Sequence, residues 1–253
     1  MANFICVKWG DKFPAYYVNR LLRGIERHYT GDVRFICVTD DTTGIDPKVE
    51  TVPLVRQPFE DAMDEAFKTS RRRGAMRKVA LFNPDLIPDL EGDVLGFDLD
   101  VVITGPLNDL VDFEPGKVCM RFDWLEKKRG RFGGHGSVFK FNPQQHGYLY
   151  HDLCEHTLKY LEEANFSEQK YTSQRANARD DLRFYPDDWI ASFKRDAMRM
   201  PPLNHILAPK LPDNTRVMCF HGTPKMEEAL VGYNGPFHRK TVPAPWLSEN
   251  WVD

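Results

Sequence analysis

The sequence predicts an α/β fold in which a mixed, mainly parallel central sheet carries helices on both faces. Three observations indicate it. Short apolar runs at 4–7 and 35–38 have the β-branched and aromatic content of buried strands. Between them, apolar residues of 17–25 recur at helical spacing. A strand, helix and strand in this order form a parallel pair of strands joined by a right-handed crossover. The third observation is the length of 253 residues, which is enough to bury a large core.

The expected elements then follow in order. Strands are expected at 4–7, 35–38, 49–53, 93–104, 117–121, 137–141 and 216–220. Helices are expected to begin near Pro14 and Pro224, and a third is expected over 144–161, where leucines form a stripe. The segment 162–183 is polar and shows no period, so we expect a mobile surface loop or lid there.

Composition excludes several classes of protein. The net charge of −3 argues against a general nucleic-acid binder. The 5 cysteines are scattered and lack zinc spacing, which indicates reduced thiols. No signal peptide is evident, and no apolar run approaches the roughly 20 residues that cross a bilayer. We therefore expect a cytoplasmic protein without a transmembrane segment. The arginines at 71–73 leave peripheral contact with a membrane open as an alternative to a solvated charge run.

One domain over 1–253 is the expected organisation. The sequence shows no internal repeat, low-complexity tract or clear linker. The tail over 231–253 carries prolines together with Trp246 and Trp251, and we expect it to wrap over the body.

The run 93–104 carries two carboxylates, Asp98 and Asp100, near the expected end of a buried strand. Because alternate residues of an extended chain face the same side, both carboxylates share one side and Leu99 points away. Two buried, unpaired carboxylates cost several kcal/mol each, and a divalent cation would relieve that cost. Oxygen ligands suit magnesium or manganese. The alternative is that one aspartate caps a turn and the other is solvated.

Other polar groups also follow expected strands. Ligands of open α/β sheets bind beyond the carboxyl ends of strands, where Lys8, Asp40 and His221 fall. A neutral imidazole at 221 can add a nitrogen ligand to a metal. Gly222 allows close approach of an anion to the backbone, and Lys225 can neutralise phosphate. Read alone, His221 is more simply a satisfied core or surface histidine and Lys225 a solvated surface charge, but together with the two carboxylates they favour a single pocket.

Two segments resemble those of a known enzyme family. Residues 97–107 resemble the metal-binding Asp-x-Asp segment of GT-A glycosyltransferases, and His221-Gly222-x-x-Lys225 resembles the C-terminal segment of family 8-like members. Residues 134–142 resemble the family's Asn-Ser/Ala-Gly-Val strand, although His135 stands where the family usually has Asn. The resemblance runs from about 4 to 230.

The resemblance implies a GT-A fold whose nucleotide-binding half is Rossmann-like. About 1–105 would form the nucleotide-sugar-binding half, about 106–230 the acceptor half with the metal-binding histidine segment, and 231–253 a tail. The implied activity is metal-dependent transfer of a sugar from a nucleotide-diphospho-sugar, in the first place a UDP-sugar, with retention of configuration. The acceptor is a glycan, lipid or protein that the sequence does not identify.

Roles of individual residues also follow from the resemblance. Asp98, Asp100 and His221 would hold Mn²⁺ or Mg²⁺. Asp98, Asp100 and Lys225 are the candidate catalytic residues, because metal and lysine stabilise the charge of the leaving diphosphate. Donor contacts are expected from Lys8, Trp9, Asp40, Lys78, Asp98, Gly222 and Lys225, and sugar or acceptor contacts from His135, Glu168, Gln169 and Asp188. Core packing for Trp9 and a solvated charge for Lys78 stay open as alternatives.

Two other functions compete with glycosyl transfer. Phe97-Asp98-Leu99-Asp100 also resembles the nucleophile loop of haloacid-dehalogenase-like phosphohydrolases, in which the first Asp attacks phosphorus. That family expects Gly-Thr-like residues after the second Asp, where this chain has Val101-Val102. A noncatalytic relative that only binds a nucleotide sugar is the second alternative.

Overall fold

The computed structural model describes residues 1–67 and 75–252, and the strands in these ranges form two sheets. The 7-stranded sheet has the order β3-β2-β1-β4-β7-β6-β8, and the 3-stranded sheet has the order β5-β10-β9. In the large sheet, β7 runs antiparallel to both neighbours and all other pairs are parallel. The predicted α/β class with a mainly parallel sheet is therefore confirmed. The strands are β1 (Ala2–Lys8), β2 (Val33–Thr39), β3 (Glu50–Pro53), β4 (Val94–Phe97), β5 (Val101–Ile103), β6 (Val118–Phe122), β7 (Gly134–Phe141), β8 (Leu182–Phe184), β9 (Ile190–Ser192) and β10 (Val217–Cys219).

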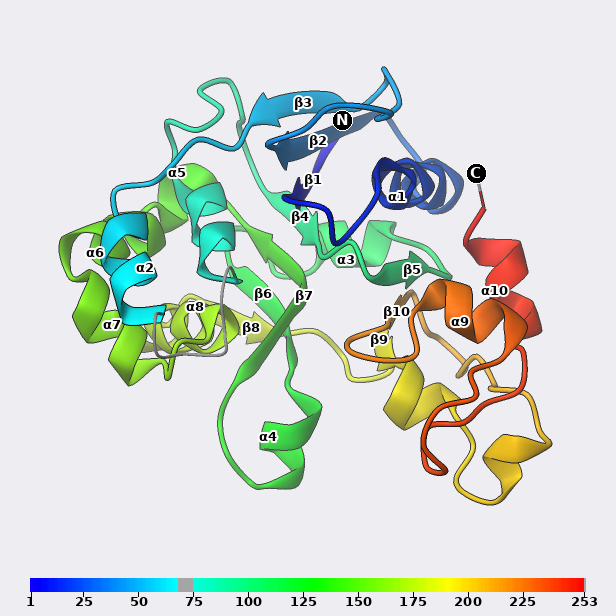
Figure 1. Ribbon diagram of the computed structural model, residues 1–253. Coiled ribbons are helices and arrows are strands. Elements are labelled where there is room, and N and C mark those ends of the chain that lie inside the picture. The colour runs from blue at the N-terminus through cyan, green and yellow to red at the C-terminus, as the bar shows by residue number, and fades with distance from the viewer. Residues whose placement is uncertain (68–74, 253) are drawn as a thin grey trace.

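Helices cover both faces of the large sheet (Figure 1). Helices α1 and α10 pack in one hydrophobic core, and η1, α6 and α8 pack in a second core on the other face. In the described part of the chain no helix is long and apolar enough to span a membrane. The helices are α1 (Ala15–His28), α2 (Glu60–Phe67), η1 (Ala75–Phe82), α3 (Asn108–Asp112), α4 (Trp124–Lys128), α5 (Pro143–His146), α6 (Tyr148–Glu155), α7 (Thr157–Glu163), α8 (Glu168–Ala178), η2 (Phe193–Ala197), η3 (Leu203–His205), α9 (Met226–Val231) and α10 (Pro245–Asn250).

Alternating side chains of the central strands supply both cores. In β1, Phe4 and Cys6 enter the α1 core, whereas Ile5 and Val7 enter the opposite core. A strand buried on both faces therefore reads as a continuous apolar run. This is why the first two strands were visible in the sequence.

The run 93–104 is two strands, so the expectation of one strand was wrong. β4 pairs parallel with β1 in the large sheet, whereas β5 pairs antiparallel with β10 in the small sheet. Asp98, Leu99 and Asp100 form the connection between the sheets. The Asp98 amide donates to the Ser137 carbonyl (2.9 Å), and the Phe220 amide donates to the Asp100 carbonyl (2.8 Å). The chain can change sheets here because both ends of this connection are hydrogen-bonded.

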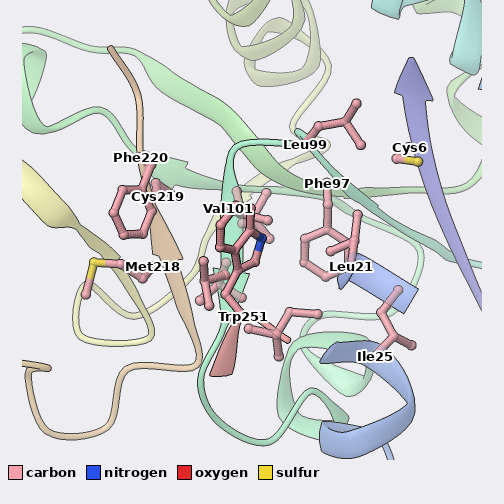
Figure 2. Packing of buried hydrophobic residues seen from close by; sticks show 14 of the residues in the cluster. Cys6, Leu21, Ile25, Phe97, Leu99, Val101, Met218, Cys219, Phe220 and Trp251 are labelled. Carbon is pink, nitrogen blue, oxygen red and sulfur yellow. The ribbon is translucent and has the colours of Figure 1, made fainter. Parts of the chain in front are cut away.

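Leu99 anchors the connection in the α1 core. Figure 2 shows it beside Phe97, with side chains of α1, β5 and β10 and the tail residue Trp251 in the same cluster. Trp251 also packs against Tyr17 of α1, with 5.5 Å between ring centroids, so the tail lies against the body as expected.

Two further expectations were wrong. The polar segment 162–183 is not an irregular loop, because it contains α8, which packs against β7 and η1. That helix buries small polar residues such as Thr172 and Ser173, so its sequence shows no apolar period. The helix expected over 144–161 is interrupted at Gly147 and His156. The arginines at 71–73 lie outside the described residues.

Candidate active site

Lysines contact both carboxylates of the connection between β4 and β5. The Asp98 carboxylate accepts hydrogen bonds from Lys78 Nζ (2.9 Å) and Ser137 Oγ (3.0 Å). Burial alone would raise the pKa of Asp98, but Lys78 and Ser137 outweigh it and hold the pKa below its usual range. Asp100 pairs with Lys225. Its pKa is nevertheless raised, by burial and by the neighbouring charge of Asp98. The site therefore holds two carboxylates that repel each other.

Lys78 of η1 is the buried cation of the site. Besides Asp98 it donates to the Gly136 carbonyl (2.7 Å) and lies 3.3 Å from Glu168 Oε2. Burial raises the pKa of Glu168, and the charge of Asp98 adds to this shift. A side chain at 136 would place its Cβ 3.0 Å from Glu168 and 3.1 Å from Lys78. Glycine at this position therefore lets η1, β7 and α8 meet around the lysine.

His221 follows β10 and carries no charge at neutral pH. Burial, together with nearby cations and His135, lowers its pKa to about 3. Its Nε2 lies 2.8 Å from Ser192 Oγ, and its ring stacks on Trp124 with 5.4 Å between centroids. A neutral imidazole keeps a lone pair on one ring nitrogen, and the neutral form is therefore the one that binds metals.

The segment after His221 brings Lys225 to the site. Gly222 has φ +85°, a backbone conformation that strains other residues, and a Cβ there would also displace the Lys194 ammonium, which lies 2.8 Å away. Lys225 begins α9, where its amide donates to Glu228 Oε2 (2.7 Å). Its Nζ donates to Asp100 and to the Phe220 carbonyl (3.0 Å). The helix start and the strand end thus hold this lysine against the carboxylates.

These residues line two adjoining cavities. The larger, of about 550 Å³, is lined by Lys78, both aspartates and Gln169, and also by Trp9 and Phe13. The smaller, of about 410 Å³, shares the aspartates and adds His135, His221 and Lys225. Residues that follow β1, β4 and β10 thus converge, as expected for the carboxyl ends of strands, and the antiparallel β7 adds His135 and Ser137 from its beginning.

Three expected site residues do not line either cavity. Lys8 lies 4.0 Å from Asp41, and Asp40 accepts from the Gly10 amide (3.0 Å), so both organise the turn after β1. Asp188 is exposed and accepts from Asn214 Nδ2 (3.3 Å).

Other lining residues were not identified from the sequence. Lys12 lines both cavities, and Phe13 and Ser137 each line one. Lys12 and Phe13 follow β1 in a polar turn that carries no motif. Ser137 belongs to the segment 134–142 that resembles the family, so the sequence could indicate its place near the site. Its hydrogen bond to Asp98 could not be predicted from the sequence.

The carboxylate and imidazole groups of the site suit a divalent metal, but they are not arranged around a common point that a metal ion could occupy. No group of three or more His, Cys, Asp or Glu residues within 1–67 and 75–252 is close enough to hold a metal ion. Two carboxylates and a neutral imidazole do line the 410 Å³ cavity together. A cation there would relieve the repulsion that raises the pKa of Asp100. Asp100 would have to exchange Lys225 for the metal.

Comparison with known proteins identifies the fold. No protein-family model matches the sequence, and a search of curated proteins finds no match. Among solved structures, the galactosyltransferase LgtC in complex with donor and acceptor sugar analogues is similar, with a TM-score of 0.59 and 14% identity over 88% of each chain. Mouse xyloside xylosyltransferase 1 has a TM-score of 0.55 and 10% identity over 88% of this chain and 99% of its own.

The glycosyltransferase GlyE of Streptococcus pneumoniae TIGR4 is also similar, with a TM-score of 0.56 and 12% identity over 89% of this chain. The match covers 56% of GlyE. The chain therefore has the fold of these glycosyltransferases, and the predicted GT-A class is confirmed.

Proposed function

We propose that this protein is a family 8-like glycosyltransferase that takes its sugar from a nucleotide-diphospho-sugar, with a UDP-sugar as the first candidate. Asp98, Asp100 and His221 would hold Mn²⁺ or Mg²⁺. The acceptor would be a glycan, lipid or protein, and we expect the reaction to retain configuration at the sugar. Residues 1–105 would supply most of the donor site, and 106–230 the acceptor side.

One observation carries the proposal. The fold of glycosyltransferases brings two carboxylates, a neutral imidazole and a lysine from separate strands to adjoining cavities of about 550 and 410 Å³. A diphosphate with a bridging metal needs this combination of oxygen, nitrogen and ammonium groups.

The residues would divide the chemistry as follows. The metal, when bound, supplies positive charge to the diphosphate that leaves as the glycosidic bond breaks. Lys225, which contacts Asp100, would donate to the same phosphates once the metal releases it. Lys78 holds Asp98 ionised, because it lowers the pKa of that carboxyl. Glu168 and Gln169 line the larger cavity and would contact sugar hydroxyls.

A donor-hydrolysis screen tests the proposal. The full chain is incubated with a set of nucleotide sugars, with and without manganese, and release of the nucleoside diphosphate is measured. We expect manganese-dependent release from at least one UDP-sugar and a loss of about a hundredfold in Asp100→Asn. Asp61→Asn is the matched control, because this aspartate is 86% exposed on α2 and, within residues 1–67 and 75–252, pairs with Arg56 alone.

Other outcomes would contradict the proposal. Unchanged hydrolysis in Asp100→Asn would remove this carboxylate from the reaction. Binding of a nucleotide sugar without transfer or hydrolysis would assign the chain to noncatalytic binding. Release of phosphate from simple phosphoesters, lost in Asp98→Asn, would favour the phosphohydrolase.

A further inference from the structure

Large apolar side chains are exposed on two short segments, 199–210 and 236–240. Ile206 is 72% exposed and Phe237 is 63% exposed, although side chains of this kind are normally buried. Clusters of exposed apolar side chains mark interaction sites. The exposed members are Met200, Leu203, Ile206, Leu207 and Phe237.

The two segments form one surface, which we call the basic apolar face. Asn204 Nδ2 donates to the carbonyls of Phe237 (2.9 Å) and Lys240 (2.8 Å). The rings of His205 and Phe237 lie 4.5 Å apart. In Figure 1 the yellow-to-orange chain around η3 and the red-orange chain after α9 lie at the same lower right end of the molecule. Residues about thirty positions apart in sequence therefore share a face.

The same face and its border are strongly basic. Residues 194–210 and 236–240 contain six lysines and arginines and a single carboxylate, Asp196, although the whole chain has a net charge of −3. Asp196 is already bound by Trp124 Nε1 and the Ser192 amide. Among the residues that the structure describes, five of these cations form no ion pair: Lys194, Arg195, Arg199, Arg239 and Lys240. Their charge is therefore available to an anionic partner.

We propose that the basic apolar face docks the protein on a bilayer that contains anionic lipids. Exposed isoleucine, leucine and phenylalanine side chains gain free energy by entering the boundary between headgroups and acyl chains. Lysines and arginines around them are attracted to anionic headgroups. Neither a nucleic acid nor an acidic protein would use several exposed aliphatic side chains together with unpaired cations in this way, and both are separate outcomes of the test below.

The face also borders the candidate active site. Arg239 Nη1 donates to Thr223 Oγ1 (3.2 Å), and Thr223 lines the 410 Å³ cavity beside His221. Docking would therefore place this cavity next to the membrane surface, within reach of an acceptor that is a lipid. The docking proposal does not depend on the proposed function, because its test measures binding to vesicles and not enzyme activity.

Vesicle co-sedimentation of the full chain tests the proposal. We expect binding to vesicles of equal parts phosphatidylcholine and phosphatidylglycerol, little binding to phosphatidylcholine alone, and weakening with salt. Ile206→Asp combined with Phe237→Asp should reduce binding at least about tenfold. Replacing Arg199 and Lys240 by Glu should reduce it about fivefold or more for each position, which corresponds to about 1 kcal/mol per charge.

Matched controls lie on α7, in the other part of the molecule. Leu158 is 54% exposed, and Lys159 beside it is exposed as well. Leu158→Asp and Lys159→Glu should leave vesicle binding unchanged. Circular dichroism and donor hydrolysis of every variant report whether the fold and the cavity are intact.

Three outcomes would overturn the proposal. The native protein fails to bind anionic vesicles, the α7 controls lose as much vesicle binding as the face variants, or the face variants bind vesicles as well as the native protein does. Self-association that Ile206→Asp abolishes, without vesicle binding, would assign the face to a second copy of the chain. Binding of an RNA or an acidic peptide without vesicle binding would likewise replace the membrane with that partner.

Discussion

Replacing Lys78 by methionine removes the buried cation that serves two carboxylates. Its Nζ lies 2.9 Å from Asp98 and 3.3 Å from Glu168, and its side chain is only 10% exposed. Breaking a buried ion pair by removal of one partner costs about 3–5 kcal/mol. Because the Asp98 side chain is 36% exposed, water screens part of that loss, and we expect a decrease of about 3 kcal/mol in the free energy of unfolding.

The loss should depend on pH with a defined sign. In the native protein Lys78 holds the pKa of Asp98 below its usual range, and this stabilisation is present above the unfolded pKa and disappears as pH falls through the folded value. In Lys78→Met both carboxyls would have raised pKa values, so their charges destabilise the fold most at neutral pH. The difference between native protein and variant should therefore shrink from pH 7 to pH 5. Urea unfolding followed by circular dichroism measures it.

Lys140→Met is the matched control. Lys140 is also buried and also pairs with a carboxylate, Asp93 (3.0 Å), but it lies outside both cavities. Both variants should lose stability, and only Lys78→Met should lose affinity for the nucleotide-sugar donor. Unchanged stability of Lys78→Met at pH 7, or equal donor affinity in the two variants, would refute the reasoning.

Three further variants test other parts of the site. Burial lowers the pKa of His135 to about 4, so the folded protein keeps this imidazole neutral while the unfolded chain binds a proton, and stability falls as pH falls from 6.5 toward 4. Urea unfolding of His135→Gln should show about 2 kcal/mol less dependence on pH between 7 and 5. Gly96→Ala would place a Cβ 2.3 Å from the Phe139 ring and should lower stability by about 1–3 kcal/mol in the same assay, whereas an unchanged midpoint would contradict this packing. Gly222→Ala should lower the affinity for the nucleotide-sugar donor, measured by calorimetry. Gly92→Ala is the control, because Gly92 has a similar φ of +80° and open space around it, and it should lower only the free energy of unfolding.

Much of the central sheet could be predicted from the sequence because its strands are buried on both faces. Alternation in β1 and β2 feeds two cores, so both strands appear as unbroken apolar runs. The rule of alternation does not apply at Asp98 and Asp100, because they lie in the turn between β4 and β5; Leu99 packs in the α1 core and also lines the 550 Å³ cavity with both aspartates. His221 was expected to share a pocket with those aspartates, and all three line the 410 Å³ cavity, although β10 belongs to the small sheet.

The remainder depends on contacts between distant parts of the chain. The change of sheet at Asp98 is held by hydrogen bonds to Ser137 and Phe220, and no local pattern encodes them. Helix α8 buries Thr172 and Ser173 against neighbouring elements, so periodicity of apolar residues could not reveal it. Pairing of Lys78 with both Asp98 and Glu168 joins three segments, and its burial is visible only in the folded chain.

The central claim is that Asp98, Asp100 and His221 bind one metal ion together with a nucleoside diphosphate. Electron paramagnetic resonance of Mn²⁺ titrated into the full chain with UDP tests it most directly. We predict one bound manganese per chain in the native protein, and weaker binding by about tenfold to a hundredfold in Asp100→Asn and His221→Gln. No bound manganese in the presence of UDP, or binding that both variants leave unchanged, would contradict the claim.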